Sequence, residues 1–147
     1  MALRLSQALL EETFGHFRTC GAGKRECQAL WVGPWSHPDV ISRVVHPAHS
    51  ASPVGFQLDE RWLNAFWFDL ADRQEGVRAQ VHTHPGAAYH SSTDDDFPII
   101  RSEGFLSLVI PRFATGPVGF ECAFLAKVKG GHFEDVRIAD ELEVINA

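Results

Sequence analysis

Two histidines separated by one residue, His82 and His84, lie in the segment HTHPGAAYHSSTDD, which spans residues 82–95. Residues 77–84, VRAQVHTH, are typical of a β-strand, on which successive side chains point to opposite faces. Both imidazoles would therefore lie on one face with their backbones about 6–7 Å apart, and Thr83 would point the other way. At this separation two imidazoles can bind a single metal ion.

A hydroxyl and a carboxylate follow the histidines at a spacing that suits a helix. Seven residues separate His84 from Ser92, and Asp95 comes three positions after Ser92. On a helix that begins near Ser92, residues three apart share a face, so Asp95 would lie one turn beyond the serine. Two histidines and one carboxylate leave the fourth position of a tetrahedral zinc ion open, which is the pattern of a catalytic rather than a structural zinc site.

A His-x-His pair alone is weak evidence, because a chain with eight histidines contains such pairs by chance and the segment could equally be a polar surface loop. Three other classes of His-x-His protein do not fit. A metallo-β-lactamase needs an acid two residues after the second histidine, where this chain has Gly86. An amidohydrolase needs a full barrel, which 147 residues cannot build. A cupin needs a glutamate a few residues downstream, where this chain has Ala87, Ala88 and Tyr89.

The complete spacing resembles the core signature of the JAMM metalloproteases, whose domain is also called the MPN domain. That signature is His-x-His, seven residues, Ser, two residues, Asp, and it is present here from His82 to Asp95 without a gap. The family's remaining element is a glutamate just before an early strand that ends in glycine. Glu26 occupies that position in RECQALWVG, which ends at Gly33. The resemblance covers nearly the whole chain in the order of its elements.

The resemblance implies zinc-dependent hydrolysis of an amide bond. Zinc would be bound by His82, His84 and Asp95, and it would make water a usable nucleophile near neutral pH. Glu26 would take a proton from that water and return it to the leaving amine. Ser92 would donate a hydrogen bond to the developing oxyanion.

The resemblance also implies a substrate class. Residues 95–114, DDFPIIRSEGFLSLVIPRFA, are similar to a segment found in the prokaryotic branch of the family, which is associated with bacterial ubiquitin-like conjugation systems, some of them linked to phage defence. The substrate would be a ubiquitin-like protein cut after its C-terminal glycine, with E1-like and E2-like enzymes as further candidate partners. A processing peptidase for a β-grasp sulfur-carrier protein and a non-catalytic MPN assembly module remain alternatives. The sequence also leaves open whether Glu26 or another acid is the base.

Helical periodicity and capping residues predict three helices that would position these groups. Ser6 would cap the first helix, which CGAG at residues 20–23 ends. Asp59 would cap a second helix, and Ser91 or Ser92 a third that runs to about Glu103. The apolar side of the first helix comprises Leu9, Leu10, Thr13, Phe14 and Phe17. The core-facing residues of the second are Trp62, Leu63, Phe66, Trp67 and Leu70.

Runs rich in β-branched and aromatic residues, bounded by turn residues, predict the strands. They cover residues 27–33, 40–45, 54–58, 77–84, 105–111, 120–128 and 132–138. Helices interspersed with strands in this order indicate an α/β protein with a mixed sheet flanked by helices, in one domain of residues 1–147. The resemblance implies more specifically a single JAB/MPN domain, a cytidine-deaminase-like three-layer sandwich.

Composition excludes several classes of function. A net charge of -6 and the lack of any block of Lys or Arg argue against a nucleic-acid partner or an anionic membrane surface. The longest apolar runs, such as AFWF and LVIP, are far too short to span a bilayer. Glu11 and Glu12 lie where a signal peptide would need its apolar core, so a cytoplasmic location is expected.

The cysteines and the remaining histidines offer no further motif. Cys20, Cys27 and Cys122 are odd in number and form no Cys-x-x-Cys pair, which argues against both a disulfide framework and a thiolate metal site. They are expected to be small reduced residues. Five histidines lack a partner at the usual ligand spacing and are expected to be structural: His16, His37, His46, His49 and His132.

Overall fold

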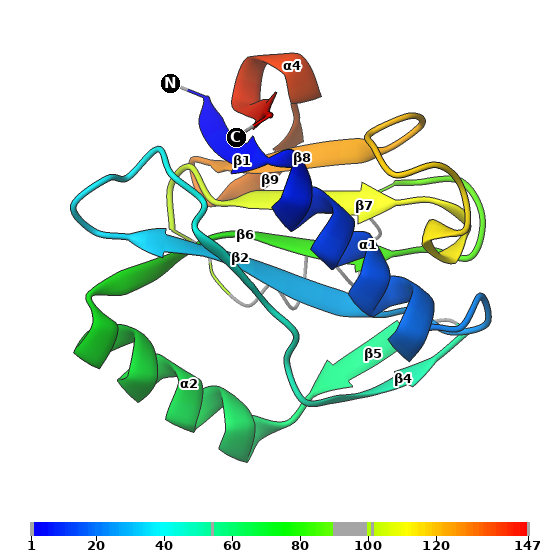
Figure 1. The fold of residues 1–147 in the computed structure, drawn as a ribbon, viewed down its shortest axis with the longest axis horizontal. Coiled ribbons are helices and arrows are strands. Elements are labelled where there is room, and N and C mark those ends of the chain that lie inside the picture. The colour runs from blue at the N-terminus through cyan, green and yellow to red at the C-terminus, as the bar shows by residue number, and fades with distance from the viewer. Residues whose placement is uncertain (1, 54, 90–99, 101, 147) are drawn as a thin grey trace.

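A six-stranded mixed sheet forms the centre of the protein in the computed structural model, which describes residues 2–53, 55–89, 100 and 102–146 (Figure 1). The strand order is β3-β2-β6-β7-β8-β9. Only β6 and β7 run parallel; the other neighbours are antiparallel. The strands are β2 (Gln28–Pro34), β3 (Arg43–Val45), β6 (Glu75–Thr83), β7 (Leu106–Ile110), β8 (Phe124–Lys129) and β9 (His132–Asp135).

Two long helices, α1 (Gln7–Cys20) and α2 (Glu60–Arg73), pack on opposite faces of this sheet. Phe14 and Phe17 of α1 share a core with Trp31 of β2. Phe66 of α2 packs instead against Leu30, the neighbouring residue of the same strand. Because adjacent residues on a strand face opposite ways, the two cores lie on the two sides of the sheet. The predicted α/β class and the mixed sheet flanked by helices are confirmed.

The sequence signals for the two helices also hold. The Ser6 Oγ accepts a hydrogen bond from the Leu9 backbone N–H at 3.1 Å, and an Asp59 carboxylate oxygen accepts one from the Trp62 N–H at 2.8 Å. These contacts satisfy backbone donors that the first turn of a helix leaves unpaired. The prediction that Trp67 is a core residue is wrong, since 36% of its surface is exposed on the outer side of α2.

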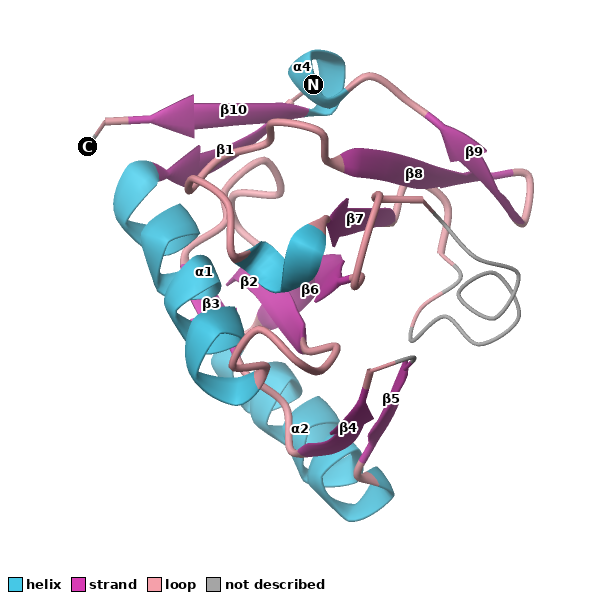
Figure 2. Ribbon diagram, turned by 90° about the vertical axis from the view of Figure 1, so that its right-hand side faces the viewer, coloured by secondary structure: helices cyan, strands magenta, loops and turns pink. Residues whose placement is uncertain are grey.

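Several short elements were not predicted. β1 (Leu3–Ser6) and β10 (Leu142–Ile145) form a separate parallel pair and lie side by side in Figure 2. β4 (His49–Ser52) and β5 (Gly55–Leu58) form an antiparallel pair apart from the large sheet, of which only β5 was expected. The short helix α4 (Ile138–Glu141) and the single helical turn η1 (Arg112–Ala114) were not predicted either.

The segment of the third predicted helix, from Ser91 to about Glu103, lies for the most part outside the described residues. Among the helices that the structure does describe, none combines the length and the apolar character needed to cross a bilayer.

Candidate metal and catalytic site

The two motif histidines lie at the end of β6, in the interior of the protein. The His82 side chain is fully buried, His84 is 4% exposed, and their ring centroids are 5.1 Å apart. Thr83 between them faces the other side of the sheet, where its Oγ1 accepts a hydrogen bond from the Cys27 backbone N–H at 3.0 Å. The alternation expected from the sequence thus places both imidazoles on one face.

Backbone contacts hold His84 in place where β6 ends. Its N–H donates to the Ile110 carbonyl at 3.0 Å, and its carbonyl accepts from the Phe113 N–H at 2.8 Å. Phe113 belongs to η1, in which Arg112, Phe113 and Ala114 have φ values of 54°, 53° and 60°. Such left-handed conformations are unfavourable for residues other than glycine. The turn η1, whose Phe113 N–H bonds the His84 carbonyl, is therefore strained.

Glu26 lies two residues before β2, the antiparallel neighbour of β6. Gln28 pairs with His82, and the Thr83 N–H donates to the Cys27 carbonyl at 3.1 Å, which extends the pairing by one step. If the same register continued by one more residue, Glu26 would lie opposite His84, on the face that carries the two imidazoles. Glu26 is 6% exposed, so its carboxyl group belongs to the interior at this end of the sheet.

Ser92 and Asp95, the two other predicted site residues, lie outside the described residues. Residues 85–87, which directly follow His84, are exposed, so the chain leaves the protein interior immediately after the two motif histidines. Tyr89 is 56% exposed, and its ring meets the His84 ring edge-on with centroids 4.7 Å apart. The aromatic ring therefore flanks the imidazole pair on the solvent side.

The donor groups at this end of the sheet suit zinc. Zinc binds imidazole nitrogens at about 2.0–2.1 Å, and two rings with centroids 5.1 Å apart on one face can both reach one ion. A buried carboxylate across the strand pair, at Glu26, adds a group that can exchange a proton with water. His82 and His84 thus fit a metal site, to which the predicted Asp95 would add the third ligand.

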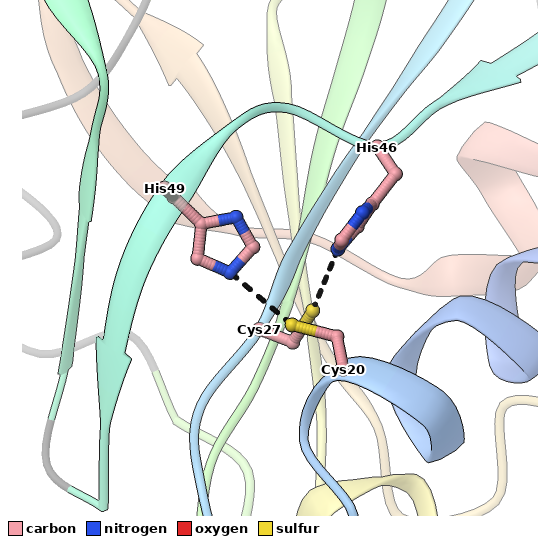
Figure 3. A group of neighbouring side chains, drawn as sticks. All are labelled: Cys20, Cys27, His46 and His49. Carbon is pink, nitrogen blue, oxygen red and sulfur yellow. Dashed lines mark hydrogen bonds between the residues drawn. The ribbon is translucent and has the colours of Figure 1, made fainter.

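A second group of donors, which the sequence analysis missed, lies on the other face of β2. One ligand atom from each of Cys20, Cys27, His46 and His49 lies within 4.8 Å of every other (Figure 3). From the sequence, no thiolate metal site was expected, and His46 and His49 were expected to be structural because they lack a partner at the usual ligand spacing. The fold nevertheless brings one donor atom of each of the four residues together. The four residues come from separate segments with irregular spacing, which a motif search does not detect.

The surroundings of this cluster oppose charge on Cys27 and His46. Burial raises the pKa of the Cys27 thiol, and hydrogen bonding and charge interaction with Cys20 raise it further. Burial lowers the pKa of His46, and the neighbouring imidazoles of His49 and His16 lower it further. The His46 imidazole is therefore held neutral, the form in which it can bind a metal.

Comparison with known proteins gives relatives of similar sequence and matches to solved structures. No protein-family model matches the chain. A Sinorhizobium fredii protein named as the probable metalloprotease y4jG is 37% identical over 110 residues, which cover 71% of this chain and 68% of the relative.

Two solved structures resemble the fold along almost its whole length. A Desulfitobacterium hafniense protein, solved in solution, matches with a TM-score of 0.69 and 18% identity over 99% of this chain and 94% of that one. A JAB1/MPN domain protein from Archaeoglobus fulgidus matches with a TM-score of 0.56 and 18% identity over 98% of both chains. At this identity the two matches establish the fold alone.

Proposed function

Because the chain belongs to the JAMM/MPN family of metalloproteases, we propose that it is a zinc-dependent peptidase or isopeptidase that cuts the amide bond after the C-terminal glycine of a ubiquitin-like protein. The observation that carries the proposal is the pair of buried imidazoles at the end of β6, together with a buried glutamate, Glu26, two residues before the neighbouring strand β2.

His82, His84 and Asp95 would hold the zinc ion. When bound, zinc supplies the Lewis acidity that makes water a usable nucleophile near neutral pH. Glu26 accepts a proton from water at its carboxylate and then donates a proton to the amine that leaves. The Ser92 hydroxyl donates a hydrogen bond to the oxyanion that forms on the substrate carbonyl. The roles of Ser92 and Asp95 rest on their places in the sequence motif.

The exposed residues beside the imidazole pair support an extended glycine-rich tail as the substrate. Between His84 and Tyr89 the side chains are those of Pro85, Gly86 and two alanines, so a deep pocket for a large side chain is not expected there. Glycine lets the substrate backbone approach the site closely, and an extended tail can be held by main-chain hydrogen bonds to a strand edge.

A cleavage assay tests the function. The zinc-loaded protein is incubated with a panel of ubiquitin-like proteins, including β-grasp sulfur carriers, each carrying a C-terminal extension after its terminal glycine. We expect hydrolysis at that glycine for at least one member, loss of hydrolysis with a chelator, and recovery when zinc is restored. Glu26→Gln should lower turnover by about 10²–10⁴-fold, whereas Glu143→Gln, at an exposed acid, should not.

The substrate class has its own control. Replacing the tail glycine before the cut with a bulky residue should abolish hydrolysis. Equal cleavage of that variant, or of unrelated unfolded peptides, would contradict the assignment to ubiquitin-like tails and indicate a general metallopeptidase. Hydrolysis that survives complete removal of metal would contradict the metalloprotease mechanism itself.

A further inference from the structure

We propose that Cys20, Cys27, His46 and His49 bind a structural zinc ion, which is distinct from the ion proposed at His82 and His84. This site does not depend on the proposed function, since it uses none of the same residues. Four protein ligands would close the coordination sphere, which is typical of structural zinc sites, whereas a catalytic site keeps one position open.

The distances in the cluster match those of a tetrahedral site. The Cys20 Sγ is 3.4 Å from the His49 Nε2, and the Cys27 Sγ is 3.1 Å from the His46 Nε2. Bond lengths of about 2.3 Å for Zn–S and 2.0–2.1 Å for Zn–N place neighbouring ligand atoms about 3.3–3.8 Å apart around a tetrahedral ion. All four ligand atoms already lie within 4.8 Å of one another, so small shifts would complete the site.

The histidines are oriented as zinc ligands commonly are. The His49 Nδ1 lies 2.7 Å from the Pro47 carbonyl oxygen, to which it donates its hydrogen. That bond fixes the tautomer and directs the lone pair of Nε2 toward the Cys20 sulfur, the arrangement usual for a metal-bound histidine and its outer partner. In Figure 3 the nitrogens of His46 and His49 that face the sulfurs converge on one region between the four side chains.

Three segments meet at the site. Cys20 ends α1, Cys27 immediately precedes β2, and the histidines flank the connection from β3 to β4. A tight turn brings the two cysteines together: the Lys24 and Arg25 N–H groups both donate to the Gly21 carbonyl. A Cβ at Gly21 would lie 2.7 Å from the Arg25 carbonyl oxygen, so the turn requires glycine at this point.

The two cysteines would bind zinc as thiolates. Two thiolates balance the charge of Zn²⁺, and a coordinated thiol is deprotonated outright. A disulfide between the two cysteines would not account for the two imidazoles, each of which directs a ring nitrogen at one of the sulfurs at 3.1 or 3.4 Å.

The position of the site suggests what it does. Cys27 lies between Glu26 and Gln28, and its N–H bonds the Thr83 hydroxyl on the face of the sheet opposite His82 and His84. One ion therefore cannot be shared between the two groups of ligands. Zinc at Cys27 would fix the end of the strand that carries Glu26 and so position this residue without touching the substrate.

Metal analysis combined with cobalt substitution tests the proposal on the full chain. We expect Co²⁺-loaded wild-type protein to show sulfur-to-cobalt charge-transfer absorption and tetrahedral visible bands. The absorption should be lost in Cys20→Ser and kept in Cys122→Ser, whose thiol is exposed. Zinc content should fall by one equivalent in Cys20→Ser and in His49→Ala, and should not change in His132→Ala, at an exposed histidine.

The outcomes separate this site from the proposed catalytic one. His82→Ala should lose one zinc equivalent yet keep the charge-transfer absorption, which reports only on thiolate ligands. Absence of that absorption from cobalt-loaded wild-type protein would overturn the proposal, and this result does not depend on whether any variant folds. A Cys20–Cys27 disulfide in freshly purified protein, detected by mass spectrometry after alkylation without reductant, would overturn it as well.

Discussion

The hydroxyl of Thr83 joins the two strands that carry the proposed catalytic groups, and its removal should be measurable both in stability and in turnover. It accepts a hydrogen bond from the Cys27 N–H at 3.0 Å, and the two residues are 1% and 0% exposed. Thr83→Val keeps the shape of the side chain but takes this acceptor from a buried donor that water does not reach. The expected cost is about 1–3 kcal/mol.

This loss of unfolding free energy can be expressed as a fall in the melting temperature. With an unfolding entropy of about 2.1 cal/mol/K per residue, a loss of 1–3 kcal/mol in a chain of 147 residues lowers the melting temperature by about 3–10 °C. Turnover should fall by up to about 100-fold, because Glu26 adjoins the loosened pair and small displacements of a catalytic group are costly. The zinc held by His82 and His84 should not be lost, since Thr83 faces away from these two residues.

Calorimetry, metal analysis and the cleavage assay on zinc-saturated protein check these values. Thr83→Ser keeps the hydroxyl and should stay near wild type, and Thr19→Val makes the same change at an exposed position of α1. A melting temperature of Thr83→Val equal to that of the Thr19→Val control would refute the reasoning that this hydrogen bond holds the strand ends together.

Three further results are expected. Glu26→Gln should keep its zinc, measured by metal analysis, while kcat falls by about 10²–10⁴-fold; full activity would place the base elsewhere. Ser92→Ala should lower kcat by about 10²–10³-fold, as loss of one oxyanion donor does, and an unchanged kcat would remove that role. Arg112→Gly should raise the melting temperature by an amount equal to about 1 kcal/mol or less, because glycine adopts the φ of 54° found there without strain. A lower melting temperature would show that the side chain stabilises the turn.

Local signals in the sequence were sufficient to predict α1, α2 and the main strands. Ser6 and Asp59 cap α1 and α2 as expected, because a capping contact involves residues three positions apart and leaves a short pattern. The placement of His82 and His84 on one face could also be predicted locally, because it follows from the alternation of side chains along a single strand. The burial of Glu26 could be expected from the family resemblance but not from composition, since it depends on how the segment before β2 lies in the fold.

The features that were missed depend on contacts between distant parts of the chain. β1 and β10 are four-residue strands near the two termini and pair in parallel, so neither is recognisable without the other. β4, with the sequence HSAS, lacks the apolar residues that mark a strand. Trp67 fits a helical period but falls just outside the buried stripe of α2. The cluster of Cys20, Cys27, His46 and His49 has irregular sequence spacing, and only the fold brings its members together.

The most direct test of the central claim is an anomalous difference map from crystals of the zinc-loaded protein, recorded on both sides of the zinc absorption edge. We predict a zinc peak about 2.0–2.1 Å from one nitrogen each of His82 and His84, with a carboxylate oxygen of Asp95 as the third protein ligand. Glu26 should lie beside the open position without binding the ion directly. A map with no zinc between His82 and His84, from protein that is active on its substrate, would contradict the account.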